Sequence, residues 1–415
     1  MPRLDPKAHD ISIDLDGQTL PARAGEPVAC SLVAAGEPLF ARSVKYHRPR
    51  GPYCFAAACS QCLMRVDGVP NVFTCRVPAT NGMRLERQNA FPSAKLDLFA
   101  ATDWMFPHGL NHHEMLAGVP IAQDVMAVVA RQLAGLGKLP DREAPPRAPA
   151  EIVKVPIAIV GAGTSGLAAS QALLERGVEH LVLERESFAG GRSAYGVPEG
   201  EGVELPFASP RVRLQHNVMG LFEDDGGRFL AVIANERLYK VYAKKLLIAV
   251  GAHPSLPAFG NNDLPGIYAA RAVSRMIRRH RVLPGDRIAI VGDAAEAERL
   301  ARLVHDCGAE SLAVGAEIVA AHGFNSVTSV TVKRGGVEEK VSCDAVAVCA
   351  AGSPAFELAR QGGARVVFDG TRFIVEADAD GRTAHPDVVV AGEQLGPCSA
   401  AESVERGRRA AGVLA

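Results

Sequence analysis

The feature that most constrains the fold is a glycine-rich turn that joins an apolar strand to a helical segment. The run Val155–Val160 is apolar, and the turn after it reads Gly161-Ala-Gly163-Thr-Ser-Gly166. The pattern predicts a helix over 167–176 and a second strand over 180–184 that ends on an acidic residue. A strand, a G-x-G-x-x-G turn, a helix and an acidic residue in this order are typical of a βαβ unit that binds a dinucleotide. The chain is therefore predicted to build an α/β fold around a parallel sheet.

Each glycine of this turn has a physical role. Gly161 permits the tight turn, Gly163 lets a pyrophosphate approach the backbone at the positive end of the helix, and Gly166 allows close helix packing. Glu184, 18 positions after the last glycine, is predicted to bind the ribose hydroxyls of the adenosine half.

Two further strand-to-glycine turns favour a larger, flavin-type architecture. They lie at Gly251 and at Gly392-Glu393, and both are predicted to close a second face of the same cofactor. A third turn begins like another dinucleotide site at Gly292, but its second glycine is replaced by Ala294. The strand and turn pattern still predicts a nested NAD(P)-type subdomain at about 260–350. Because a Cβ at position 294 obstructs the approach of a pyrophosphate, NAD(P) binding is left open, with the balance against it.

Four cysteines in the amino-terminal part have metal-ligand spacing. Cys54, Cys59, Cys62 and Cys75 follow C-x4-C-x2-C-x12-C, and the first three match the plant-type ferredoxin pattern. Small residues between them let the backbone offer N–H groups to the sulfurs, so a 2Fe-2S centre is predicted. A zinc site is the alternative, but only one C-x2-C unit is present. We interpret the other cysteines as structural: Cys30, Cys307, Cys343, Cys349 and Cys398.

The local patterns divide the chain into three parts. Residues 11–20 predict a β-hairpin around Asp16-Gly17, and residues 26–35 predict a helix, which together suit a β-grasp layout. We expect a 2Fe-2S ferredoxin-like domain at 1–90, a connecting segment with a Pro-rich linker at 91–150, and a two-dinucleotide-binding (Rossmann-like) flavoprotein fold at 151–415.

Charge and hydropathy exclude several function classes. The chain has 45 Lys and Arg against 46 Asp and Glu, a formal charge of −1, so nucleic-acid binding is not expected. The first residues have no apolar leader pattern, and no apolar run of about 18 residues occurs, so we expect no membrane span and a cytoplasmic location.

Some polar clusters carry no clear chemistry. The histidines His108, His112 and His113 lack the spacing of a helical metal motif and are interpreted as packing or interface residues. A basic run either neutralises a cluster or docks a partner, or is a solvated loop: Arg42, Lys45, His47, Arg48 and Arg50. No catalytic acid or base is predicted.

The motifs also resemble a known family over nearly the whole chain. Through Pro49-Arg-Gly-Pro-Tyr-Cys54, the four cysteines and Asp67-Gly-Val-Pro-Asn, the amino-terminal part is similar to the ferredoxin-like component of hydrogen cyanide synthase and opine oxidase systems. The runs 45–51 and 134–140 resemble the alpha subunit of heteromeric sarcosine oxidase. The remainder resembles the flavoprotein subunit of those complexes and of dye-linked proline dehydrogenase.

The resemblance implies cofactor contacts residue by residue. It assigns Gly161, Gly163, Gly166 and Glu184 to the pyrophosphate and ribose of FAD, and Gly190, Gly191 and Arg192 to the turn that follows. Gly392-Glu393 stands where these flavoproteins usually have Gly-Asp, whose carboxylate contacts the ribityl chain.

The resemblance also implies a function. We expect an electron-transfer subunit, with FAD and a 2Fe-2S cluster, of a hetero-oligomeric dehydrogenase or oxidase that acts on the CH–NH bond of a secondary amine or amino acid. The implied partners are a substrate-oxidising flavoprotein beta subunit and an electron acceptor, and a shared FMN at the subunit interface is left open. The alternatives are an NAD(P)H-dependent reductase that supplies an oxygenase, and a non-catalytic assembly subunit.

Overall fold

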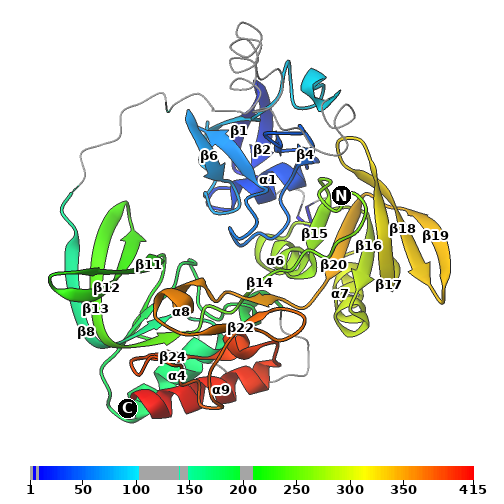
Figure 1. Cartoon of the computed structure of the whole chain (residues 1–415). Helices are drawn as coiled ribbons and strands as arrows, with labels where there is room; N and C mark the ends of the chain where they lie inside the picture. The colour runs from blue at the N-terminus through cyan, green and yellow to red at the C-terminus, as the bar shows by residue number, and fades with distance from the viewer. Residues whose placement is uncertain (1–2, 6–8, 102–139, 141–147, 197–208) are drawn as a thin grey trace, which may run out of the picture. The chain divides into compact units, whose positions relative to one another are not determined.

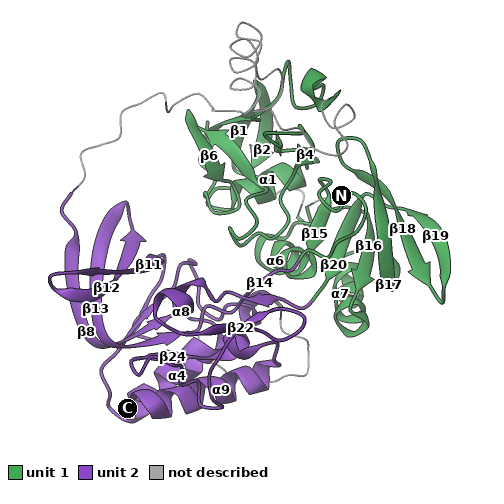
Figure 2. Ribbon diagram, viewed as in Figure 1, with its two compact units in different colours: residues 1–144, 256–350 green, residues 145–255, 351–415 purple. Residues whose placement is uncertain are grey.

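The computed structural model describes residues 3–5, 9–101, 140, 148–196 and 209–415 (Figure 1). The chain forms two compact units, residues 1–144 with 256–350 and residues 145–255 with 351–415 (Figure 2). The first unit therefore joins the expected ferredoxin-like domain to the expected nested subdomain, here taken as residues 256–350. The domain limits at 90 and 150 stay predictions. Three predictions lie outside the described residues: a helix expected from the amphipathic pattern of Val125–Leu136, the histidines His108, His112 and His113, and most of the Pro-rich linker.

The amino-terminal part of the first unit is a five-stranded sheet with one helix. Its strand order is β2-β1-β7-β5-β6, with β1 parallel to β7 and hairpins at either side. The hairpin predicted over 11–20 is confirmed, and Asp16 and Gly17 both have positive φ, as its tight turn requires. The elements are β1 (Ile11–Leu15), β2 (Gln18–Ala22), α1 (Val28–Ala34), β5 (Leu63–Val66), β6 (Val69–Phe73) and β7 (Arg84–Glu86).

The nested subdomain contains a six-stranded sheet in the order β15-β20-β16-β17-β18-β19. The first four strands are parallel and the last pairs are antiparallel. The strands are β15 (Ile267–Ala269), β16 (Arg287–Gly292), β17 (Glu310–Gly323), β18 (Val327–Arg334), β19 (Val337–Ser342) and β20 (Ala345–Cys349), and the helices are α6 (Ala270–His280) and α7 (Ala294–Asp306).

The second unit is built on a sheet in the order β10-β9-β8-β13-β12-β11, with β24 paired to β13. The predicted strand at 155–160 is part of a longer β8, and the helix predicted over 167–176 begins earlier, at Thr164. The main elements are β8 (Glu151–Val160), α4 (Thr164–Glu175), β9 (Leu181–Leu183), β10 (Val212–Arg213), β11 (Asn217–Asp224), β12 (Gly227–Ala234), β13 (Arg237–Ile248), β24 (Val388–Val390) and α9 (Ala400–Leu414).

Short elements complete both units. They are β3 (Ala41–Arg42), β4 (Pro49–Arg50), η1 (Leu98–Ala100), α5 (Ser193–Gly196), β14 (Ala252–His253), β21 (Ser353–Pro354), α8 (Glu357–Gln361), β22 (Val366–Phe368), β23 (Phe373–Val375) and η2 (Gly392–Leu395). Among the described residues, no helix combines the length and the apolar character needed to cross a membrane.

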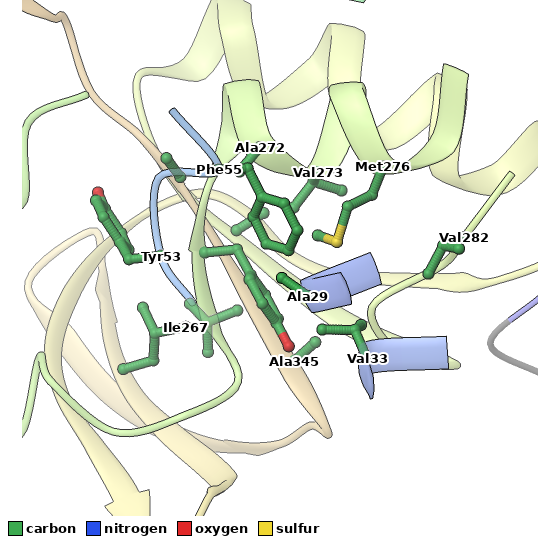
Figure 3. Close-up of a cluster of buried hydrophobic side chains, with 14 of the residues drawn as sticks. Ala29, Val33, Tyr53, Phe55, Ile267, Ala272, Val273, Met276, Val282 and Ala345 are labelled. Atoms are coloured by element: carbon green, nitrogen blue, oxygen red, sulfur yellow. The ribbon is translucent and has the colours of Figure 1, made fainter. Parts of the chain in front are cut away.

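The two parts of the first unit share one apolar core (Figure 3). Phe55, from the cysteine loop, is 1% exposed, and its ring lies 6.4 Å from the ring of Tyr268 in β15. Full burial of a side chain of this size contributes about 1.5–3 kcal/mol to folding. Helix α1, the cysteine loop and α6 supply Ala29, Val33, Tyr53, Phe55, Ala272, Val273 and Met276 to this core.

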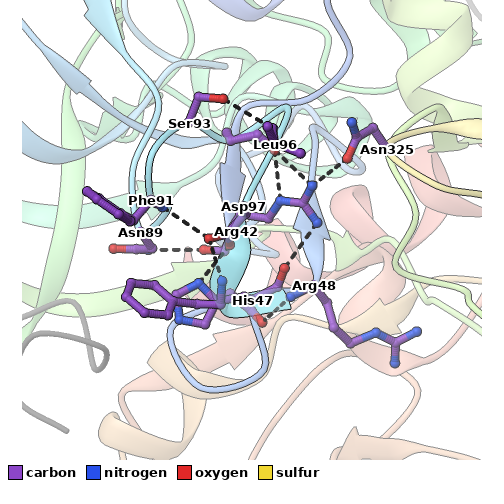
Figure 4. Close-up of polar contacts among 12 residues, drawn as sticks. Arg42, His47, Arg48, Asn89, Phe91, Ser93, Leu96, Asp97 and Asn325 are labelled. Carbon is purple, nitrogen blue, oxygen red and sulfur yellow. Dashed lines mark hydrogen bonds and ion pairs between the residues drawn. The ribbon is translucent and has the colours of Figure 1, made fainter. Parts of the chain in front are cut away.

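The basic run also joins these two parts (Figure 4). The buried Arg42 donates to Ala94 O at 2.8 and 2.9 Å, to His47 O at 3.1 Å, and to the side-chain oxygen of Asn325 in the nested subdomain. His47 is also buried, and its Nδ1 lies 2.8 Å from a carboxylate oxygen of Asp97.

Two neighbouring arginines also bind the nested subdomain, through ion pairs. Arg48 lies 3.2 Å from the carboxylate of Asp263, and Arg50 also pairs with that carboxylate. The interpretation of the whole run as a solvated loop is therefore wrong. Three arginines of the run bind the nested subdomain of the same chain, and of its five basic residues only Lys45 is exposed.

We predict that Arg42→Ala lowers the free energy of unfolding of the chain by about 2–4 kcal/mol, because several buried acceptors lose a charged donor at once. Lys45→Ala, on the same loop, is expected to change it by less than about 0.5 kcal/mol. Urea unfolding of the two variants checks this, and equal effects would contradict the docking role of Arg42.

Candidate functional site

The cysteine loop precedes β5 and has an unusual backbone. Phe55, Ala57 and Ser60 all have left-handed φ, between 49° and 54°, although none is a glycine. Each such residue costs about 1–2 kcal/mol, so the rest of the unit has to hold the loop in this form.

The loop turns its N–H groups toward sulfur, as the small residues predict. The N–H groups of Ala56 and Ala58 donate to Cys54 Sγ at 3.3 and 3.4 Å. Donors of this kind stabilise the negative charge of a metal-bound thiolate.

The four sulfurs form two hydrogen-bonded pairs, Cys54 with Cys59 and Cys62 with Cys75. The pKa of Cys54 falls to about 6, first because the Cys59 thiol donates to it and then because backbone N–H groups do, while burial opposes the shift. The pKa of Cys62 is lowered first by a hydrogen bond from Cys75, again against burial. The pKa values of Cys59 and Cys75 are raised, first by donating to these thiolates and then by burial.

Two pairs of thiols fit two irons. Each iron of a 2Fe-2S centre takes two thiolates, and each pair of cysteines supplies two. Four thiols in two pairs are the donor set of a two-iron centre, so the residues of this loop fit that group.

The predicted dinucleotide turn lies between β8 and α4. Gly161 has φ +100°, and a Cβ on it would lie 2.5 Å from Ala249 O. A Cβ on Gly166 would lie 1.9 Å from Gly161 O, so α4 packs against the turn as expected. A Cβ on Gly163, in contrast, would meet only Gly191 Cα at 4.0 Å. The space in front of Gly163 is thus open, and a phosphate group can use it.

The amino-terminal end of α4 is suited to an anion. Gly163 is its N-cap, no side chain caps it, and no acidic residue stands in its first turn. The N–H groups and the positive end of the helix dipole are therefore available to a pyrophosphate.

Glu184 lies beside this turn, just after β9, and is 7% exposed. Its two oxygens accept from Ala162 N at 2.7 Å and from Glu186 N at 2.8 Å. Burial raises its pKa, and the two N–H donors partly oppose that shift. Each carboxylate oxygen can accept a second bond, so the predicted ribose contact is chemically compatible with this position.

The structure also brings the other predicted residues to this place. Gly190 N donates to Ala162 O at 2.7 Å, and a Cβ on Gly191 would lie 2.9 Å from Gly163 Cα. Arg192 Nη1 lies 3.1 Å from Glu393 Oε1, so an ion pair joins the turn at 190–192 to the turn at 392–393.

The turns at Gly392 and Gly251 lie close together, and Gly392 packs against the amino-terminal end of α4. A Cβ on Gly392 would lie 2.5 Å from Ser165 Oγ, and a Cβ on Gly251 would lie 3.6 Å from Glu393 Oε2. The sequence analysis missed Gln394, which is fully buried and donates to Gly251 O at 2.8 Å and to Ala355 O at 3.1 Å. Its position directly after Gly392-Glu393 was the available signal.

The second, altered motif has the opposite electrostatics. Helix α7 is capped by Asp293, whose carboxylate accepts from Glu296 N at 2.8 Å. Glu296 itself stands in the first turn, and Ala294 is the first helical residue. Two carboxylates thus neutralise the positive helix end that a pyrophosphate would need, and the residues do not fit NAD(P).

Comparisons with known proteins agree with this geometry. Residues 8–90 match a 2Fe-2S iron-sulfur cluster binding domain, and residues 159–223 match an NAD(P)-binding Rossmann-like domain. The structure is similar to that of L-proline dehydrogenase from P. horikoshii, with a TM-score of 0.75, 19% identity, and coverage of 98% of this chain and 73% of that one. The fold and sites therefore define a flavoprotein with a ferredoxin-like 2Fe-2S domain, whose cofactors are FAD and a 2Fe-2S cluster.

The sequence relatives point to a more particular group. The sarcosine oxidase alpha subunit of Rhizobium meliloti is 26% identical over 407 residues, which cover 86% of this chain and 41% of that protein. The hydrogen cyanide synthase subunit HcnB of Pseudomonas protegens is 28% identical over 36% of each chain. This chain resembles the alpha-type subunits of heteromeric amine and amino-acid oxidases, and it spans less than half the length of the sarcosine oxidase subunits it matches.

We predict that Gly163→Ala leaves the fold intact but weakens FAD binding by at least about tenfold, because the added Cβ enters the space that the pyrophosphate would use. Gly412→Ala, on α9, is the matched control, since its Cβ would meet nothing nearer than 3.7 Å. Fluorescence titration with FAD measures the affinity. An unchanged affinity in Gly163→Ala would place the pyrophosphate elsewhere.

We predict that Cys62→Ser or Cys75→Ser lowers the iron and sulfide content of anaerobically purified protein to well below half of the wild-type value, because one iron loses a thiolate. Flavin content should stay constant, since FAD is predicted to bind in the other unit. Cys307→Ser is the control and should keep its iron. Full iron content in Cys62→Ser and Cys75→Ser would refute the ligand assignment.

Proposed function

We propose that this chain is the electron-transfer subunit of a hetero-oligomeric dehydrogenase or oxidase that acts on the CH–NH bond of a secondary amine or amino acid. The observation that carries the proposal is the presence, in one chain, of a two-pair thiolate loop and an open, uncapped dinucleotide turn. A flavin can accept two electrons together and release them singly, which matches the one-electron capacity of an iron–sulfur centre. The names of the relatives, which are subunits of oxidases and synthases, support it.

The chain's own residues have separate tasks in this proposal. The amino-terminal end of α4 and Gly163 bind the pyrophosphate, and Glu184 orients the adenosine ribose. The ion pair with Arg192 fixes the carboxylate of Glu393 next to Gly251, where the ribityl chain is predicted to run.

The substrate-oxidising step is assigned to a partner. No residue of this chain is predicted as a catalytic acid or base, so we propose a flavoprotein beta subunit that oxidises sarcosine, proline, an opine or a glycine-like substrate. An FMN shared at the subunit interface and a separate terminal electron acceptor belong to the same proposal. We place the complex in the cytoplasm, where cysteines stay reduced.

The acidic cap of α7 supports one direction of electron flow over the other. An NAD(P)H-dependent reductase would need the nested subdomain to hold a pyrophosphate, and Asp293 and Glu296 oppose that. Electrons are therefore proposed to enter from the amine at the partner and not from NAD(P)H.

We predict that neither NADH nor NADPH bleaches the visible spectrum of the anaerobic purified chain, whereas an amine or amino-acid substrate bleaches it once the beta subunit is present. Each of the four substrate types is added in turn to the co-purified complex, and to the chain alone as the control. Rapid bleaching by either nucleotide would favour the reductase. A cofactor-loaded complex that no substrate reduces would favour a non-catalytic assembly subunit.

A further inference from the structure

An arginine of the nested subdomain reaches into the iron–sulfur loop. Arg275 lies on α6 and is 5% exposed, and its Nη1 donates to the carbonyl oxygen of Phe55 at 2.8 Å. Phe55 directly follows the predicted ligand Cys54, and 220 positions separate it from Arg275. The guanidinium is therefore hydrogen-bonded to the Phe55–Ala56 peptide, whose N–H group donates to Cys54 Sγ at 3.3 Å.

The same helix holds the other side of that ligand. The N–H group of Ala269, at the start of α6, donates to the carbonyl oxygen of Tyr53 at 3.1 Å. The carbonyl groups of the residues before and after Cys54 thus both bind the nested subdomain, and Phe55 keeps a left-handed φ of 49°. Helix α6 fixes where Cys54 sits.

The charge of Arg275 acts inside this core. A guanidinium stays protonated in proteins, and a charge acts more strongly when water is excluded. At the neighbouring Cys30, burial and Glu26 raise the thiol pKa, and Arg275 and Arg3 lower it. The carboxylate of Glu26, which acts on the same thiol, pairs with Arg3 and accepts a hydrogen bond from Ser31 Oγ at 2.6 Å.

We infer that Arg275 sets the reduction potential of the 2Fe-2S centre, and that the nested subdomain serves as the holder of the iron–sulfur loop instead of a nucleotide site. The inference deepens the proposed electron relay and rests on its 2Fe-2S centre. The centre gains one negative charge when it takes up one electron. A buried cation beside a ligand stabilises the reduced form more than the oxidised form, so it raises the potential.

The test is a redox titration of the full purified chain, followed by electron paramagnetic resonance, with dithionite as the reductant. Arg275→Gln removes the charge and is expected to make reduction at least about tenfold less favourable, a shift of about 59 mV to more negative potential. Arg275→Lys keeps the charge and is expected to stay close to the wild-type potential. Arg278→Gln, on the exposed side of the same helix, is the matched control and is expected to leave the potential unchanged.

Iron content decides how each outcome is interpreted. Arg275→Gln with full iron and an unchanged potential would overturn the inference, as would equal shifts in the Gln and Lys variants. If Arg275→Gln fails to keep iron, the Lys variant decides. Iron and the wild-type potential retained in Arg275→Lys would support the inference, and loss of iron in both variants would overturn the inference. The titration needs no amine and no partner, so a failed amine oxidation leaves it intact, whereas a wild-type chain without iron would refute the cofactor assignment itself.

Discussion

The contact between the iron–sulfur loop and helix α6 is the constraint on which the first unit depends. The loop carries left-handed, non-glycine residues at Phe55, Ala57 and Ser60, a form that a short loop does not keep by itself. Two carbonyl groups beside Cys54 are bound by α6, and the side chain of Phe55 enters a core shared by both parts of the unit. The ferredoxin-like part and the nested subdomain are therefore one structural body.

The second unit depends on a different constraint, which is that a charged ligand has to approach the backbone closely. Its turns at Gly161, Gly191 and Gly392 pack so tightly that a Cβ at any of them would meet a neighbouring atom within 3 Å. Gly163 alone of the fingerprint faces open space, at the uncapped end of α4. In the corresponding strand–turn–helix unit of the nested subdomain, a carboxylate caps the amino-terminal end of α7. One copy of the unit keeps its positive end available and the other neutralises it.

Local features were predictable from the sequence because their causes are local. The hairpin at Asp16-Gly17 follows from turn chemistry, and the strand–turn–helix at Gly161 follows from a glycine pattern with few alternatives. The choice of Cys54, Cys59, Cys62 and Cys75 as ligands follows from their spacing and from the small residues between them, and it stays a prediction. The predicted start of α4, at 167, was too late because Gly166 is part of the first turn of the helix, which begins at Thr164.

The docking within the first unit was not predictable in the same way. Arg42 and Arg275 are arginines, which are mostly exposed, and nothing near them in sequence signals burial. Their partners Asn325 and Phe55 lie 283 and 220 positions away, so only the fold brings them together. Gln394 was missed for a related reason, since its two acceptors, Gly251 and Ala355, lie on separate segments.

The most direct test of the account is the number of electrons that the purified chain accepts in an anaerobic dithionite titration. A chain that holds both centres is predicted to take up about three electrons, two for FAD and one for the 2Fe-2S centre. Uptake of only about two electrons, with no paramagnetic signal from iron, would contradict the claim that one chain carries both parts of the relay.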